Sequence, residues 1–188
     1  MKEIRWHGRG GQGGFTAARL LGMAGSLYEN YYVQAFPSFG PERRGAPVLG
    51  FTRIDTKPIN DHSKVYFCDY VVVLDESLID AVDVWEGLKK GGTLLVNSGR
   101  GPEYFQASDD HRVYTIPATD ISWEIIGQPI VNTAMFGALV AVSDLVSLAS
   151  ALRAVELTLP KEIWEKNKRV VAAAYNWLRQ NAILGGKV

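Results

Sequence analysis

The sequence predicts one α/β domain over residues 1–188, with a mixed, largely parallel sheet flanked by helices. Three observations predict it. A glycine-rich loop, GRGGQGG at 8–14, separates a short extended run from a run with helical spacing. Two β-branched runs, DYVVVLD at 69–75 and TLLVN at 93–97, are typical of buried parallel strands. Helical periodicity from residue 132 onward predicts a helical C-terminal region.

The first strand and helix enclose the glycine-rich loop. Ile4 and Trp6 alternate with charged or polar neighbours in residues 3–7, which predicts a half-covered strand. After the loop, small and apolar residues at helical spacing predict a helix over 16–28.

Two more strands are expected before residue 60. The runs at 31–36 and 48–54 have the length and composition of strands. Turn-forming residues at 55–57 follow the second run, so we expect a β-hairpin into 58–59.

The middle third predicts a βαβ unit. Between the two buried strands, apolar side chains at helical spacing predict a helical crossover over 76–88, with Leu78, Ile79, Val82, Trp85 and Leu88 facing inward. A further strand at 112–116 is expected to lead into a helix at 118–126 that Thr119 or Asp120 caps.

The C-terminal third is helical. A nearly apolar stretch of 19 residues at 134–152 carries Asp144 near its middle and lacks basic flanks, which favours a buried helix over a membrane span. Asn132 is expected to cap this helix, which begins at Thr133. A last amphipathic helix is predicted over 161–181.

The glycine loop has the context of an anion site. Gly8, Gly10 and Gly13 satisfy the GxGxxG pattern between a strand and a helix, where backbone N–H groups face a phosphate. An NAD site would also carry an acid at the tip of the second strand, and Pro37 follows that strand instead. A classical NAD fingerprint is therefore disfavoured.

Composition bounds the remaining classes. Formal net charge is zero, which gives no support for nucleic-acid binding. Residues 1–53 hold seven Lys and Arg against three acids, whereas 69–86 hold six acids and no base. Cys68 is the only cysteine, so the chain cannot build a disulfide or a cysteine-ligated metal cluster by itself. No apolar segment follows the N-terminus, which favours the cytoplasm.

Five segments, in order along the chain, carry a family resemblance. They are RWHGRGGQGGFTAARLL at 5–21, VQAFPSFGPERRGAPV at 33–48, VVVLDESL at 71–78, LLVNS at 94–98, and the group Asn132, Thr133, Met135, Gly137 and Ala138. Together they resemble the gamma subunit of the pyruvate/2-oxoacid:ferredoxin oxidoreductases. A related beta-type subunit of indolepyruvate:ferredoxin oxidoreductase shares the first loop and stays open as an alternative.

The resemblance implies a subunit that is not catalytic alone. Holoenzymes of this family decarboxylate a 2-oxoacid on thiamine diphosphate with Mg²⁺, reduce ferredoxin through iron–sulfur clusters, and transfer the acyl group to coenzyme A. The resemblance assigns these cofactors to partner alpha, beta and delta subunits. It implies that this chain holds no catalytic residue and no metal, and that it closes over the active site and contributes to coenzyme A binding.

Coenzyme A carries phosphates, which backbone N–H groups and guanidinium groups bind well. The residues expected to contact it are Gly10, Gly11, Gln12, Gly13, Thr16, Arg43 and Arg44, with Arg9 as a further guanidinium. The loop could instead only pack a strand against a helix, and the arginines could pair with acids across an interface. His7 is expected to be structural. A purely structural subunit without ligand contact is the rival interpretation, and a homodimer is expected for the isolated chain.

Overall fold

Six strands form one mixed sheet in the order β2-β3-β1-β4-β5-β6. The computed structural model describes residues 1–38, 45–105 and 110–185, with side chains of the last helix described as far as residue 181. The strands are β1 (Lys2–Arg9), β2 (Tyr32–Pro37), β3 (Pro47–Asp55), β4 (Cys68–Val73), β5 (Leu88–Asn97) and β6 (Arg112–Ile116). The pairs β1–β4, β4–β5 and β5–β6 are parallel, whereas β3 runs antiparallel to both β1 and β2. The predicted α/β fold is confirmed.

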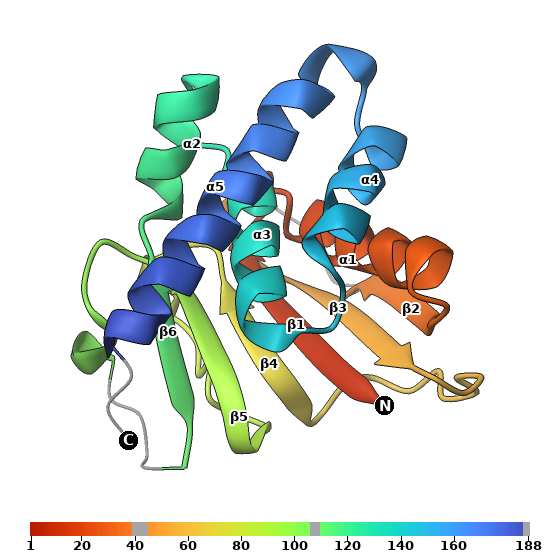
Figure 1. Ribbon diagram of the computed structural model, residues 1–188. Coiled ribbons are helices and arrows are strands. Elements are labelled where there is room, and N and C mark those ends of the chain that lie inside the picture. The colour runs from red at the N-terminus through yellow and green to blue at the C-terminus, as the bar shows by residue number, and fades with distance from the viewer. Residues whose placement is uncertain (39–44, 106–109, 186–188) are drawn as a thin grey trace.

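The α-helices lie together on one face of the sheet (Figure 1). They are α1 (Gly14–Tyr28), α2 (Ala118–Ile126), α3 (Asn132–Ser143), α4 (Leu148–Thr158) and α5 (Lys161–Gly185). The larger buried cluster joins these helices to the sheet, and a second cluster on the other face joins the strands to connecting segments such as Val65, Leu78 and Phe105. Two short 3₁₀ helices, η1 (Glu76–Leu78) and η2 (Pro102–Tyr104), lie in those connections. The expected helical C-terminal region is confirmed.

Strand β1 is buried on both faces, so the predicted half-covered strand is wrong. Ile4 and Trp6 belong to the helix-side cluster, while Arg5 and His7 are also buried, with only 7% and 5% of their surface exposed. Alternation along a strand sends Arg5 and His7 to the face opposite Ile4 and Trp6. Arg5 and His7, whose polarity predicted a solvent-exposed face, are therefore interior residues.

The crossover between β4 and β5 contains no α-helix, contrary to the prediction for residues 76–88. Only η1 is regular, and it follows Asp75, whose side chain accepts a hydrogen bond from the N–H of Ser77. Buried Arg5 donates from Nη2 to the carbonyls of Val84 (3.0 Å) and Glu86 (2.6 Å). These carbonyls are occupied by a side chain from another strand, so the helical periodicity of this segment does not produce a helix.

The hairpin in the N-terminal half lies elsewhere than predicted. β2 and β3 pair with each other, with Val33 opposite Ile54 and Ala35 opposite Thr52. Residues 58–59 form no strand. The carbonyl of Ile59 joins this segment to β2 by accepting a hydrogen bond from Gln34 Nε2 at 3.2 Å.

The apolar stretch at 134–152 is two helices, α3 and α4, rather than one. Asp144 has a left-handed backbone, with φ of 50°, and ends α3. Ser147 then caps α4 by accepting from the N–H of Ser150 at 3.1 Å. In the described part of the chain, no helix has the length and apolarity needed to cross a membrane.

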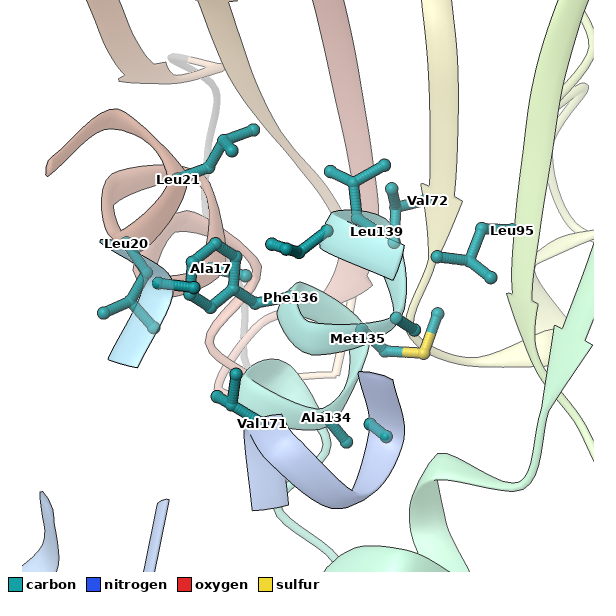
Figure 2. Close-up of a cluster of buried hydrophobic side chains, with 14 of the residues drawn as sticks. Ala17, Leu20, Leu21, Val72, Leu95, Ala134, Met135, Phe136, Leu139 and Val171 are labelled. Carbon is teal, nitrogen blue, oxygen red and sulfur yellow. The ribbon is translucent and has the colours of Figure 1, made fainter. Parts of the chain in front are cut away.

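Helix α3 is the centre of the core. Figure 2 shows Phe136 and Met135 of α3 among side chains of α1, the strands and α5. A Cβ at Gly137 would lie 2.3 Å from the carbonyl oxygen of Val171, so glycine permits the close approach of α3 and α5. This packing places the start of α3 against the glycine loop, where a Cβ at Gly13 would lie 2.5 Å from Asn132 Nδ2.

Candidate functional site

The candidate site lies along the edge where the parallel strands end. β1, β4, β5 and β6 run parallel, so their carboxyl ends meet at one edge. The glycine loop leaves β1 at this edge and enters α1, while β3 begins there at Pro47 (Figure 1). In α/β sheets ligands bind outside the carboxyl ends of strands.

The glycine loop presents the open start of α1. Gly11 and Gly13 have positive φ of 95° and 77°, a conformation that L side chains rarely adopt. The first intrahelical bond runs from the N–H of Ala17 to the carbonyl of Gly13 at 3.0 Å. Among the described residues no side chain caps α1, and no acid lies in its first turn. The N–H groups at the helix start therefore suit an anion.

The Gln12 side chain faces into the protein. Its Oε1 accepts from the backbone N–H of Arg9 at 2.7 Å, and its Nε2 donates to Asp75 Oδ2 at 3.0 Å. Arg9 Nε also donates to Asp75 Oδ2, at 3.1 Å. Gln12 and Arg9, predicted as ligand contacts, are thus both engaged by an aspartate at the end of β4.

The loop is also tied to the segment that precedes β3. The N–H of Gly10 donates to the carbonyl of Ala46 at 2.9 Å, and the N–H of Gly45 donates to the carbonyl of Gly10 at 3.2 Å. Arg9 Nη1 donates to the carbonyl of Gly45 at 3.1 Å. Predicted residues Arg43 and Arg44 lie outside the described residues, immediately before Gly45. Thr16, in the first turn of α1, is half-buried.

A polar cavity of about 440 Å³ adjoins the loop on its β5 side. It is lined by Gln12, Leu74, Asp75, Glu76, Asn97, Ser98, Gly99, Pro117, Thr119, Asp120, Pro129 and Val131. Three of these residues are acids and none is Lys or Arg. Repulsion between carboxylates and phosphate oxygens makes this cavity a poor phosphate site.

Sequence reasoning missed the hydrogen bonds that shape this cavity. Asn97 Nδ2 donates to the carbonyl of Leu74 (2.9 Å) and to Thr119 Oγ1 (3.0 Å). The residue at the N-cap position of α2 is Pro117, so the predicted cap by Thr119 or Asp120 is wrong. Thr119 contacts the neighbouring strand tip instead. The available signal was Asn97 itself, a polar residue that ends a buried parallel strand.

The start of α3 also differs slightly from the prediction. α3 begins at Asn132 rather than at Thr133, and the N-cap position is Val131. Asn132 Oδ1 accepts from the N–H of Thr133 at 2.9 Å. A Cβ at Gly13 would lie 2.5 Å from Asn132 Nδ2, so Asn132 closes the inner side of the loop.

His7 and Asp75, the described groups near this edge whose pKa values are lowered, are poor general bases. Burial, with the nearby charge of Arg5, lowers the pKa of His7 to about 3, and its Nε2 has no hydrogen-bond partner in the described structure. His7 is therefore neutral and structural, as predicted. At the opposite, amino edge of the sheet, burial raises the pKa of Cys68 to about 11, which makes this thiol unreactive. Partial burial pushes the pKa of Asp75 up, but hydrogen bonds from Ser77 and Gln12 outweigh it and hold that pKa below its usual value.

Three comparisons place the chain among known proteins. A family model described as pyruvate ferredoxin/flavodoxin oxidoreductase matches residues 3–177. The chain is 50% identical to pyruvate synthase subunit PorC of Methanothermobacter thermautotrophicus, over 93% of this chain and 94% of that protein. It is 48% identical to the pyruvate/ketoisovalerate oxidoreductases common subunit gamma of Pyrococcus furiosus, over 93% and 96% of the two chains.

A solved structure agrees in fold. The crystal structure of pyruvate oxidoreductase subunit PORC from Thermotoga maritima is similar with a TM-score of 0.80 and 39% identity, over 93% of this chain and 95% of that one. The family model and these relatives each cover most of the chain, and the relatives are matched over nearly their whole length. The chain therefore belongs to the pyruvate ferredoxin/flavodoxin oxidoreductase family, as a subunit of its gamma type.

Proposed function

We propose that residues 1–188 act as a single gamma domain in a 2-oxoacid:ferredoxin oxidoreductase, and that the glycine loop contributes to coenzyme A binding and active-site closure. The observation that carries this proposal is the start of α1, where Gly11 and Gly13 have positive φ and no side chain of the described residues caps the helix. Such an arrangement recognises phosphate oxygens.

The phosphates of coenzyme A are expected on the side of the loop that faces Gly45. The acidic cavity on the other side repels them, whereas Gly10 is hydrogen-bonded to Gly45 and Ala46, directly after Arg43 and Arg44. Planar guanidinium groups bind phosphate through paired hydrogen bonds. Gly11, Gly13, Thr16, Arg43 and Arg44 are therefore the proposed contacts. Gly10, whose N–H is bound to the carbonyl of Ala46, and Gln12 contribute by shaping the loop.

The remaining chemistry is proposed for partner subunits. Thiamine diphosphate, Mg²⁺ and iron–sulfur clusters would be held by alpha, beta and delta chains, which supply decarboxylation and electron transfer to ferredoxin. The described part of this chain contains no group of three metal-ligating side chains, and Cys68 is its only cysteine. The Pyrococcus relative is named as a subunit common to pyruvate and ketoisovalerate enzymes. By analogy, we place substrate choice on the other subunits.

Partner subunits would also cover apolar side chains that the isolated chain exposes. Phe15, Trp123 and Ile130 are 42%, 60% and 42% exposed. Phe15 lies in the first turn of α1, and Ile130 lies directly before α3. We propose an assembly in the cytoplasm, without nucleic acid or membrane, in which this edge meets the active site of a partner. An isolated chain would bury the same side chains by forming a homodimer.

The test is a reconstituted holoenzyme carrying Arg43→Ala with Arg44→Ala. Viologen reduction with pyruvate would be followed while coenzyme A is varied. We expect the apparent KM for coenzyme A to rise by roughly 10-fold or more, because two charge-assisted phosphate contacts are lost. The control is Lys166→Ala with Arg169→Ala on α5, which removes the same charge from exposed positions. An unchanged KM in the first variant would favour the purely structural subunit.

A further inference from the structure

We propose that Asp75 is the positioning residue of the glycine loop: its carboxylate holds the loop in the one conformation that presents the first-turn N–H groups of α1 to a phosphate. The inference rests on the proposed function and extends it to a residue that follows β4. Asp75 would touch no ligand itself. It would act through Arg9 and Gln12, which belong to the loop.

Both carboxylate oxygens of Asp75 are fully used. Oδ2 accepts from Arg9 Nε at 3.1 Å and from Gln12 Nε2 at 3.0 Å. Oδ1 accepts from the N–H of Ser77 at 3.1 Å and from Ser77 Oγ at 2.5 Å. One side chain therefore joins the start of the β4–β5 crossover to the glycine loop.

The contact reaches the backbone of the loop through Gln12. Gln12 Oε1 accepts from the N–H of Arg9 at 2.7 Å, and the N–H of Gln12 donates to the carbonyl of Arg9 at 2.9 Å. These two bonds close a tight turn over residues 9–12 that includes Gly11. Glycine-rich segments have many accessible conformations and lose much entropy when one is fixed. The bond from Gln12 to another strand selects one of them.

The charge of Asp75 is offset within the same cluster. Arg9 pairs with it, and the two Nη atoms of Arg9 donate to the carbonyl of Gly45 (3.1 Å) and to Ser77 Oγ (2.7 Å). Arg9 thus spans the loop, the segment before β3 and the crossover. An aspartate beside a phosphate site would otherwise repel the ligand.

The hydrogen-bond donors around Asp75 require a carboxylate rather than an amide at this position. In the described part of the chain, the hydrogen-bond partners of Asp75 are all donors, namely Arg9, Gln12 and Ser77. In an Asp75→Asn variant, one acceptor becomes an NH₂ group. If it faces Arg9 and Gln12, these two part-buried donors lose their acceptor, and if it faces Ser77, the N–H of Ser77 loses its acceptor. Asp75→Glu keeps the charge and both acceptors on a longer side chain, so it is the conservative variant.

The experiment uses the reconstituted holoenzyme with four gamma-chain variants. Asp75→Asn and Asp75→Glu test the inference, Gly11→Ala perturbs the loop directly, and Asp69→Asn is the matched control at the other end of β4. Gly11 has φ of 95° and open space around it, so its alanine variant strains the loop without a steric clash. The apparent KM for coenzyme A, the KM for pyruvate, kcat and the midpoint of thermal unfolding are measured for each.

We expect Asp75→Asn to raise the apparent KM for coenzyme A by roughly 10-fold, with the KM for pyruvate and kcat at saturating coenzyme A unchanged. Asp75→Glu should recover part of the loss, and Asp69→Asn should leave the coenzyme A dependence unchanged. If Asp75→Asn does not assemble, Gln12→Met removes the same hydrogen bond from the loop side and is predicted to give the same rise.

Two results distinguish a failure of the Asp75 inference from a failure of the proposed function. If Gly11→Ala raises the KM for coenzyme A and Asp75→Asn does not, the positioning role of Asp75 is wrong while the proposed function stands. If neither Gly11→Ala nor the double arginine variant changes that KM, the proposed function is wrong. A lower unfolding midpoint in Asp75→Asn with all kinetic constants unchanged would reduce Asp75 to a structural residue and overturn the inference.

Discussion

Strand β4 has an aspartate near each end, and the two carboxylates bind different parts of the chain. Asp69, near its start, accepts from Lys2 Nζ at 3.0 Å, Lys89 Nζ at 2.9 Å and the N–H of Glu3 at 3.0 Å. Asp75, just after its end, binds Arg9, Gln12 and Ser77. Lysine side chains at a surface have many conformations, and the pairs they form contribute little. A carboxylate that binds a glycine loop instead restricts a backbone.

The amino edge of the sheet serves stability more broadly. Arg53 in β3 is 1% exposed, and its Nε donates to Glu3 Oε1 at 3.0 Å. Its Nη1 donates to the carbonyl of Asp61 at 3.0 Å. These contacts join β1, β3 and the segment after β3 with no loop glycine involved. We therefore expect changes at the amino edge to alter unfolding without altering ligand dependence, whereas changes to the glycine loop at the carboxyl edge alter ligand dependence as well.

The largest expected effect is a loss of stability in acid, caused by the buried imidazole of His7. His7 pairs with Val73 near the carboxyl end of β1, and its folded pKa is about 3 against an ordinary value near 6.5. Below pH 6.5 the unfolded chain binds a proton that the folded chain does not. The free energy of unfolding should therefore fall with pH from 6.5 to about 3, by about 5 kcal/mol over the whole window.

Urea unfolding of the isolated chain at a series of pH values measures this loss. In His7→Leu the slope between pH 6.5 and the onset of carboxylate titration should disappear, because the buried imidazole is gone. His62→Leu, at an exposed position, is the matched control and should keep the slope. A retained slope in His7→Leu would mean that another group carries the acid sensitivity.

The next effect tests whether the amino edge is a stability element. Arg53→Met should lower the free energy of unfolding by about 3 kcal/mol, because Glu3 loses its buried partner and keeps only Lys89 at 3.6 Å. Denaturant unfolding gives the loss, and Arg179→Met, which breaks an exposed pair with Asp144, is the control. In the holoenzyme the KM for coenzyme A should not change. A change in that KM would remove the distinction between the edges.

A smaller effect compares two left-handed glycines at opposite edges. Gly13 has φ of 77° and Gly91, at the amino edge in β5, has φ of 73°. Alanine at either position strains the backbone by about 1 kcal/mol or more. A Cβ at Gly13 also meets Asn132 Nδ2 at 2.5 Å, whereas nothing lies within 4 Å of one at Gly91. Gly13→Ala should therefore cost more stability than Gly91→Ala in urea unfolding.

Function should separate these two variants further. In the holoenzyme Gly13→Ala is expected to raise the KM for coenzyme A, since it moves the start of α1, and Gly91→Ala is not. Equal stability losses together with equal kinetics would show that the loop conformation has no special role.

The sequence predicted strands and helices where the local pattern is decisive. The β-branched runs became β4 and β5, and the glycine loop entered α1 as expected. Prediction from the sequence failed where a residue distant in the chain determines the local structure. The helical periodicity after Asp75 is overridden by Arg5, which lies 79 residues before Val84 in sequence and binds its carbonyl. No local pattern reports such a contact.

The same reason explains what was missed in the site. Gln12 was predicted to contact coenzyme A as part of the glycine loop, but its side chain binds Asp75, 63 residues later. Asn97 and Thr119 meet because two strand tips adjoin, 22 residues apart. Positions at the ends of parallel strands could be predicted to cluster, whereas the particular donors and acceptors could not.

The smallest effect is expected from Asp69→Asn, and it is the most direct test of the comparison. Lys2 and Lys89 are 54% and 38% exposed, so solvent and salt screen their attraction to Asp69, and the N–H of Glu3 keeps an acceptor in the asparagine Oδ1. The loss should stay below about 1 kcal/mol and shrink further in 1 M salt, measured by urea unfolding at both salt concentrations. Asp75→Asn, measured in the same way, should depend less on salt, because its hydrogen bonds to Gln12 and Ser77 are short-range and two of its donors are uncharged. If Asp69→Asn lowers the free energy of unfolding as much as Arg53→Met, the lysine pairs of Asp69 are a main source of stability. Asp69 would then not be the weakly contributing surface carboxylate that distinguishes it from Asp75.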